Sequence, residues 1–135
     1  FEILFVPIEI DTTKYGHQEL GEQIAGRIAS GELDITAVVM GDIISVQMIA
    51  SLADRGIFVP KDISVVGLDD TYMCRYTRPQ LSSLRSPLEE MGEAAVSLLL
   101  GNIQERKENS NPLAKNLTLP KQFIIRNSTG SVPVK

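Results

Sequence analysis

The stretch Val65-Val66-Gly67-Leu68-Asp69-Asp70 decides the fold, because within it an apolar, β-branched run changes to a glycine and two carboxylates. The run begins at Ile63, and its length and composition are typical of a strand buried in a sheet. We therefore expect a buried strand over residues 63–66 that ends at Gly67, with short acidic side chains directly beyond its carboxyl end.

Two similar apolar runs precede this strand, and each predicts a further short strand. They are Ile3 to Val6 and Ala37 to Met40. Between them, Leu20, Ile24 and Ile28 recur at helical spacing after residues that favour a helix start. The first half of the chain therefore predicts an amphipathic helix between two strands.

A second helix is expected between Gly41-Asp42 and Gly56. Its expected apolar face carries Val46, Ile49, Ala50 and Ala53. The order β-α-β-α-β implies parallel strands joined by right-handed crossovers, so the expected fold class is α/β, a parallel sheet with flanking helices. In such sheets the ligand crevice lies beyond the carboxyl ends of the strands, here near Asp11, Gly41-Asp42 and Asp69.

The second half of the chain predicts a strand, a long helix and a last strand. After a strand at residues 81–85, Ser86-Pro87-Leu88-Glu89 combines a capping box with proline at the first helical position. The helix that follows has an apolar stripe of Leu88, Met91, Ala95, Leu98 and Leu99, extended by Ile103. The polar residues 104–115 predict a solvated loop, and residues 122–126 predict the last strand.

The composition limits the class of protein. With 135 residues, 43% hydrophobic and 22% charged, the chain has the size and make-up of one globular domain. Its net charge is −4 and it has no Lys/Arg cluster, so we do not expect this segment to contact DNA. The single cysteine, Cys74, fits a reducing compartment such as the cytoplasm. We expect no metal, no cofactor and no membrane.

The acidic residues at the strand ends each have two interpretations. Asp42 is placed either to cap its helix or to contact a ligand. Asp69 and Asp70 either shape a turn or offer one carboxylate to a ligand. Asp42 and Asp69 could be imagined as an acid/base pair for glycoside hydrolysis, but nothing supports that further, and His17 has no catalytic partner nearby in sequence. We therefore do not expect an enzyme.

The polar residues 68–80 predict an irregular, exposed loop. Cys74 lies in it without another metal ligand nearby in sequence, so an inert thiol is expected. Tyr72, Arg75 and Tyr76 are residue types that interfaces favour. The loop is therefore either solvated or a contact between subunits.

Five segments, in this order and spacing, resemble the lactose-repressor/galactose-repressor family of bacterial transcription regulators. They are Ala37 to Asp42, Val59 to Asp70, Pro79 to Arg85, Pro87 to Ala95 and Leu119 to Thr129. The resemblance implies a periplasmic-binding-protein-like core of two subdomains, in which a small sugar-like or nucleoside-like effector closes the cleft. It also implies a DNA-binding helix-turn-helix domain upstream, which is not in this sequence.

The resemblance also implies how the chain divides. Residues 1–85 and 120–135 would belong to the C-terminal subdomain, and residues 86–119 would be a part of the N-terminal subdomain. The chain is then expected to be a fragment that lacks most of the N-terminal subdomain. A periplasmic sugar-binding protein of a transport system shares this architecture and is the alternative interpretation.

The family's functional positions fall on two groups of residues. The effector-binding positions are Asp69, Asp11, Gly41 and Asp42. The positions in the dimer interface are Tyr72, Met73, Arg75 and Tyr76. Many relatives place an aromatic ring near Asp11, and often an asparagine at Gly41, so a more polar or cationic effector and backbone approach at Gly41 are expected. The resemblance further implies a homodimer that binds operator DNA through the upstream domain.

Overall fold

The computed structural model describes residues 17–108 and 116–132, and side chains within residues 19–106 and 116–132. The strand expected at Ile3 to Val6 and the helix start expected at residues 11–13 lie outside the described residues. The remaining elements follow the predicted order.

A sheet of four strands forms the centre of the fold. Its strands are β1 (Ala37–Val39), β2 (Ser64–Gly67), β3 (Ser82–Arg85) and β4 (Gln122–Ile124), in the order β1-β2-β3-β4. The β1–β2 and β2–β3 pairs are parallel, which confirms the α/β class, whereas β4 runs antiparallel to β3. The direction of β4 differs from a purely parallel sheet because the chain leaves the sheet at the end of β3 and returns beside the same strand.

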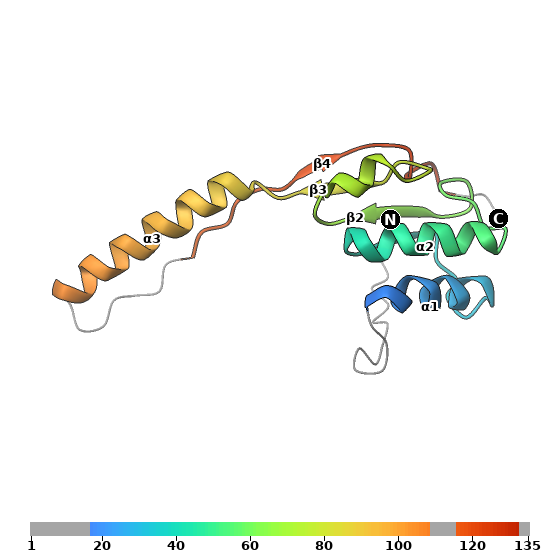
Figure 1. The fold of residues 1–135 in the computed structure, drawn as a ribbon, viewed down its shortest axis with the longest axis horizontal. Coiled ribbons are helices and arrows are strands. Elements are labelled where there is room, and N and C mark those ends of the chain that lie inside the picture. Colours follow the sequence, from blue (N-terminus) through green and yellow to red (C-terminus); the bar gives the residue numbers. More distant parts are fainter. Residues whose placement is uncertain (1–16, 109–115, 133–135) are drawn as a thin grey trace.

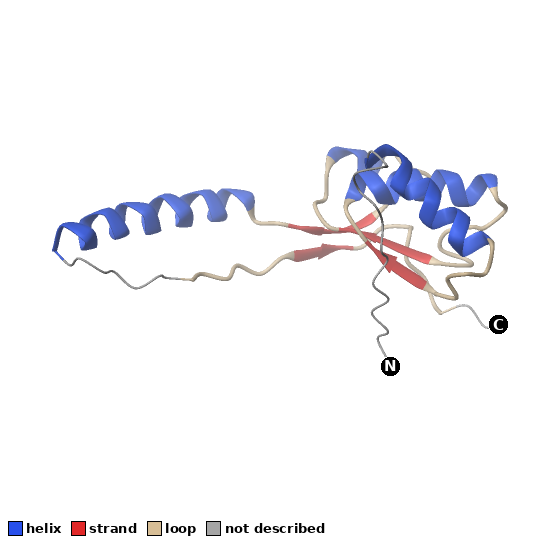
Figure 2. Cartoon of the chain, turned by 90° about the horizontal axis from the view of Figure 1, so that it is seen from below, coloured by secondary structure: helices blue, strands red, loops and turns tan. Residues whose placement is uncertain are grey.

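Helices α1 (His17–Ala29) and α2 (Asp42–Asp54) pack against each other and cover the same face of the sheet (Figure 2). Gly31 and Gly56 follow their ends with φ angles of 78° and 75°, the left-handed conformation that glycine adopts without strain. Gly21 of α1 lies so close to α2 that an added Cβ would be 2.7 Å from the backbone of Ile44. The two helices therefore meet backbone to backbone at Gly21.

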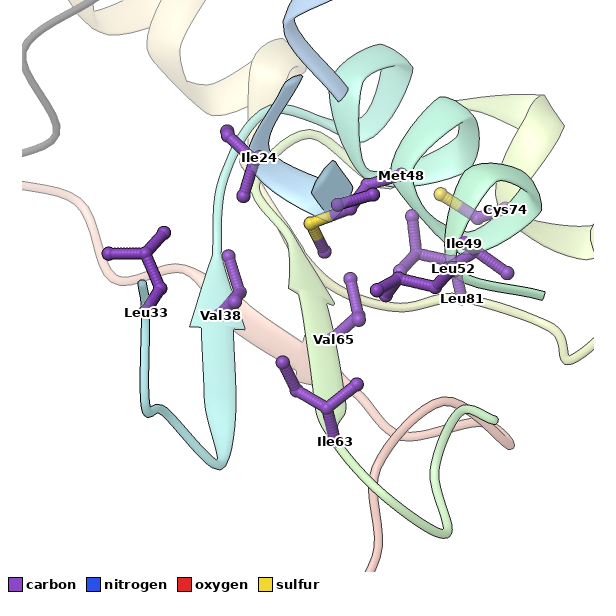
Figure 3. Close-up of a cluster of buried hydrophobic side chains, with 11 residues drawn as sticks. Ile24, Leu33, Val38, Met48, Ile49, Leu52, Ile63, Val65, Cys74 and Leu81 are labelled. Atoms are coloured by element: carbon purple, nitrogen blue, oxygen red, sulfur yellow. The ribbon is translucent and has the colours of Figure 1, made fainter. Parts of the chain in front are cut away.

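The core lies between these helices and the sheet, where side chains from α1, α2, β1 and β2 point toward one another (Figure 3). Its buried members are Ile24, Ala25, Leu33, Val38, Met48, Ile49, Leu52, Ile63, Val65, Cys74 and Leu81. The face predicted for α2 was largely wrong, because Ser45, Met48 and Leu52 are buried beside Ile49. The other predicted side chains of α2 line a surface groove instead.

The loop after β2 is more ordered than its polar sequence suggests. Residues Tyr72–Arg75 form a short 3₁₀ helix, η1, and Cys74 in that helix is fully buried. The expectation of an irregular, exposed loop was therefore wrong for the backbone of this segment and for Cys74, whereas Tyr72 and Arg75 are exposed as expected. Cys74 is buried because η1 packs against α2 and its thiol contacts Asp42.

Helix α3 (Leu88–Glu108) projects away from the α1/α2 layer (Figure 1). It continues through residues 104–108, which were expected to begin a loop. Leu88 and Leu99 of the apolar stripe are 72% and 58% exposed, so much of the stripe is uncovered by the described residues. Among those residues, α3 is joined to the sheet through β3 at one end and through the segment that leads to β4 at the other.

The end of the chain is tied into the middle of the sheet. The hydroxyl of Ser128 donates to the carbonyl of Val65 at 2.6 Å, and the amide of Val65 donates to the carbonyl of Ser128 at 2.9 Å. The same hydroxyl accepts from the amide of Ser82 at 2.8 Å. Ser128 therefore joins β2 to β3 at a point that no solvent reaches.

The contact at Gly21 gives a test of this packing. Gly21→Ala is expected to lower the free energy of unfolding by about 1–3 kcal/mol, because its methyl group would overlap the backbone of α2. Gly26→Ala, in the same helix with nothing within 4 Å of an added Cβ, is expected to raise it by about 0.5–1 kcal/mol. Urea denaturation measures both, and equal responses would contradict the close packing of α1 on α2.

Candidate functional site

Asp42 is the first residue of α2 and its side chain is buried, with 1% of the residue exposed. The carboxylate accepts hydrogen bonds from the amides of Leu68 at 3.0 Å, Asp69 at 3.3 Å and Thr71 at 2.6 Å. All three donors belong to the loop that follows β2. The interpretation of Asp42 as a cap of its own helix was wrong, because the N-cap position is Gly41 and no side chain caps the helix.

Two further donors complete the surroundings of this carboxylate. The hydroxyl of Ser83 donates to Asp42 Oδ1 at 2.8 Å, and the thiol of Cys74 donates to Oδ2 at 3.2 Å. Gly67 is required beside them, because a Cβ at that position would overlap Asp42 Oδ1. The buried carboxylate thus joins β2, η1 and β3 to the start of α2.

Burial and hydrogen bonding have opposite effects on the pKa of Asp42. Removal from water raises the pKa, but the hydrogen bonds from Thr71, Ser83 and Cys74 outweigh it and hold the pKa below 3.8. Burial and the neighbouring carboxylate together raise the pKa of the Cys74 thiol to about 11. At neutral pH the carboxylate of Asp42 is therefore charged and the thiol of Cys74 is protonated. In these states the carboxylate accepts the hydrogen bond that the thiol donates.

Asp69 differs from Asp42 in the exposure of its side chain. Its side chain is exposed, while its amide is held by Asp42. It lies on a hollow of about 420 Å³ that is formed by Asp69, Asp70, Arg85, Ser86, Pro87, Leu88, Glu89 and Glu90. The hollow lies at the carboxyl ends of β2 and β3, where a ligand crevice was expected.

The remaining expected effector positions are Gly41, Asp11 and Asp42, and they have different surroundings. Gly41 lies beside Asp42, in an extended conformation with φ −54° and ψ 144°, and an added Cβ would meet nothing within 4 Å. Asp11 lies outside the described residues. Asp42 is occupied by donors from within the chain, so its contribution at this edge of the sheet is to fix the loop that carries Asp69.

Asp70 was expected, like Asp69, either to shape a turn or to offer its carboxylate to a ligand. Its side chain is 2% exposed and makes ion pairs with Arg85 and Arg126. Burial raises the pKa of its carboxyl, but the hydrogen bonds and charges of the two arginines hold it below 3.8. Sequence reasoning missed these partners because they lie 15 and 56 residues away and no local pattern marks them.

A second surface feature is an apolar groove of about 480 Å³ between α2 and η1. It is lined by Val46, Ile49, Ala50, Ala53, Tyr72, Met73, Tyr76, Thr77 and Arg78. Tyr72 and Tyr76 are 75% and 76% exposed, and their rings meet edge to face with centroids 6.4 Å apart. The groove thus brings together three of the four residues expected in a dimer interface, while Arg75 is exposed outside it.

The described part of the chain contains neither a candidate metal site nor a candidate membrane-spanning helix. No cluster of three or more histidine, cysteine or acidic residues there could hold a metal ion. None of the helices at residues 17–108 has the length and apolar character needed to cross a membrane.

A family comparison identifies the class of protein that this fold and site define. Residues 8–129 match the family described as the periplasmic binding protein-like domain. The match covers most of the chain, so the chain belongs to this family.

The individual relatives that the chain resembles are named as transcription regulators. The chain is 35% identical over 122 residues to the HTH-type transcriptional regulator MalR of Streptomyces coelicolor, covering 90% of this chain and 33% of MalR. It is 37% identical over 79 residues to the HTH-type transcriptional repressor PurR of Erwinia tasmaniensis, covering 58% of this chain and 23% of PurR.

A solved structure agrees with these relatives. The LacI family transcriptional regulator of Enterococcus faecalis V583 with bound ribose has a TM-score of 0.66 and 30% identity. The match covers 87% of this chain and 42% of that regulator. This chain is therefore similar to part of several transcription regulators, and it spans less than half the length of these relatives.

The buried carboxylate gives a test that concerns stability. Asp42→Asn is expected to lower the free energy of unfolding at neutral pH by roughly 2–4 kcal/mol, because the amide nitrogen cannot accept the hydrogen bonds of buried donors. Asp54→Asn, an exposed change in the same helix, is expected to stay within about 0.5 kcal/mol of wild type. Urea denaturation measures both variants.

The stability of the wild-type protein and that of Asp42→Asn should depend differently on pH. The pKa of Asp42 is lower in the folded protein than its ordinary value of 3.8, so its stabilising contribution is complete above that value and is lost as pH falls through the folded pKa. The stability gap between wild type and Asp42→Asn should therefore narrow in acid. A gap that is constant down to acid pH would contradict a charged Asp42.

Proposed function

We propose that this chain is the effector-sensing and dimerisation core of a DNA-binding transcription repressor, and that its effector is sugar-like or nucleoside-like. The observation that carries the proposal is the contrast between Asp42 and Asp69. The carboxylate of Asp42 is buried and holds the backbone amide of Asp69, whose own side chain is exposed and lines the hollow.

This contrast suits ligand binding. A carboxylate accepts hydrogen bonds from the hydroxyls of a sugar or the N–H groups of a purine, and such charged hydrogen bonds are stronger than neutral ones. Binding costs less conformational entropy where the backbone of the contacting residue is already fixed, as it is for Asp69. Gly41 would allow a ligand to approach the backbone nearby, since no atom lies where its side chain would be.

The geometry also bears on the enzyme interpretation. A catalytic acid or base needs free access to the reacting atoms. Asp42 is buried and both of its oxygens accept hydrogen bonds within the chain, so a hydrolytic pair with Asp69 has no support. The relatives are named as transcription regulators, which favours a sensor without catalytic activity.

The projection of α3 supports the division into subdomains that the sequence implies. The chain passes from β3 into α3 and returns to β4, which suits two crossings between subdomains (Figure 1). We propose that residues 1–85 and 120–135 belong to the C-terminal subdomain and residues 86–119 to the N-terminal one. The effector would then bind between them, in a cytoplasmic protein.

The ligand-binding proposal is tested at Asp69. In the intact protein, Asp69→Asn is expected to weaken effector binding by about 10–100-fold, the loss that follows from a charged hydrogen bond worth roughly 1.5–3 kcal/mol. Thermal-shift screening against sugars, phosphosugars, nucleosides and purines, with ribose as the first probe, identifies a ligand. Calorimetry then measures its affinity.

Asp62→Asn is the matched control, because Asp62 is an exposed aspartate in the loop before β2 whose carboxylate accepts from the amide of Phe58. It should bind the ligand as the wild type does. An unchanged affinity in Asp69→Asn would contradict the assignment of Asp69.

The groove beside α2 is the proposed dimer contact, since Tyr72 and Tyr76 place two aromatic rings at its rim. Symmetric dimers suit palindromic operators, which would be bound through a helix-turn-helix domain outside this chain. Arg75 would lie at the polar rim of the contact.

The double variant Tyr72→Ser/Tyr76→Ser is expected to shift the intact protein from dimer toward monomer in sedimentation equilibrium, with the dissociation constant raised at least about tenfold. Phe58→Ser removes a 55% exposed aromatic ring from another surface and serves as the control. A monomeric wild type, or a dimer that the tyrosine changes leave intact, would contradict the proposal.

A further inference from the structure

The carboxylate of Asp70 lies where three segments meet. Arg85, the last residue of β3, donates to Asp70 Oδ2 through Nε at 2.7 Å and through its terminal nitrogen at 2.6 Å. Arg126, just beyond β4, donates to Asp70 Oδ1. A single buried carboxylate on the β2 side therefore holds one arginine at the end of β3 and one in the segment that follows β4.

These two strands determine where α3 points. In the described residues, the chain enters α3 from β3 and returns from it to β4 (Figure 1). The register pairs Arg85 with Gln122, at the end of the strand pair nearest α3. Arg126 lies toward the opposite end, where its guanidinium also donates to the carbonyl of Leu81. The two ion pairs thus hold the strand pair at both ends.

The backbone of Asp70 is itself fixed. It has a φ of 47°, in the left-handed region that aspartate tolerates better than most residues. Its amide donates to the hydroxyl of Ser83 in β3 at 2.9 Å. Main chain and side chain of Asp70 therefore both contact β3, so the turn after β2 and the direction of β3 are set together.

We propose that Asp70, Arg85 and Arg126 form an ion-pair clamp that fixes the direction of the β3–β4 pair and so sets the width of the hollow in front of Asp69. One side of that hollow is formed by Asp69 and Asp70, and the other by the start of α3. Arg85 spans the two sides. The ion pairs of the clamp do not require a ligand. Only the consequence that the width of the hollow limits which effector can bind rests on the proposed function.

The chemistry of the pair distinguishes a clamp from an ordinary surface ion pair. Two nitrogens of Arg85 contact the same oxygen, Asp70 Oδ2, and two donors on one rigid guanidinium restrict its orientation, whereas a lysine offers only a point charge. The side chain of Arg85 is 44% exposed, while those of Arg126 and Asp70 are 10% and 2% exposed. Arg85 is therefore the partner that can be changed without leaving a buried charge unpaired.

The test measures the direction of α3 without a ligand. Spin labels at Asp54→Cys in α2 and Ser97→Cys in α3, both exposed positions, report the distance between the two helices. The intact protein is diluted with unlabelled protein so that only distances within one chain are recorded. Wild type is expected to give a single narrow distribution, and Arg85→Gln a distribution about twofold broader or one with a shifted mean.

Three variants complete the experiment. Arg85→Lys should restore the wild-type distribution only in part, because it lacks the second donor. Asp70→Asn should broaden the distribution at least as much as Arg85→Gln, provided that its unfolding transition shows it to be folded. Arg106→Gln, an equal loss of charge at an exposed arginine of α3, should leave the distribution unchanged.

A lower unfolding temperature in Arg85→Gln with an unaltered distance distribution would overturn the proposal, since that is the result of a merely structural ion pair. The result does not depend on whether the protein binds a sugar or an operator. A failure of the clamp and a failure of the proposed function are therefore separate outcomes.

Discussion

The rest of the structure depends on one buried carboxylate. Asp42 begins α2 directly after β1, and its two oxygens accept hydrogen bonds from the loop after β2, from Ser83 in β3 and from Cys74 in η1. A charge removed from water is stable only when such donors replace its hydration. The hydrogen bonds of this one carboxylate therefore hold each of these segments in place. The carboxylate can lie this close to the backbone of β2 because Gly67 has no side chain.

The three aspartates at this edge of the sheet, Asp42, Asp69 and Asp70, have the same side chain but differ in burial and in hydrogen-bond partners because of their positions in the fold. Asp42 is buried and satisfied by neutral donors, Asp70 is buried and satisfied by two arginines, and Asp69 between its neighbours is left exposed. The buried pair fixes the backbone on both sides of Asp69. The exposed carboxylate is thus held in place by interactions in which its own side chain takes no part.

Sequence patterns predicted what depends on neighbouring residues and missed what depends on distant ones. The strand before Gly67 and the helix end near Gly56 follow from local propensities, and the structure confirms them. The partners of Asp42 are 26 to 41 residues away, and the arginine partners of Asp70 are 15 and 56 residues away. No periodicity encodes such contacts, so the role of Asp42 and the burial of Cys74 were unpredictable. The error in the face of α2 has a related cause, since Val46 and Ala53 are as apolar as true core residues.

Ser128 has a consequence for how the chain acquires its fold during synthesis. It supplies both the acceptor for the amide of Val65 and the donor for that residue's carbonyl, across 63 positions. Contacts that distant in sequence form late and slow the folding reaction. Strand β2 pairs with β1 and β3, but the amide of Val65 lacks its partner until residue 128 has been synthesised. A nascent chain that pauses before residue 128 therefore leaves part of an apolar β-branched strand incompletely hydrogen-bonded and more prone to aggregation.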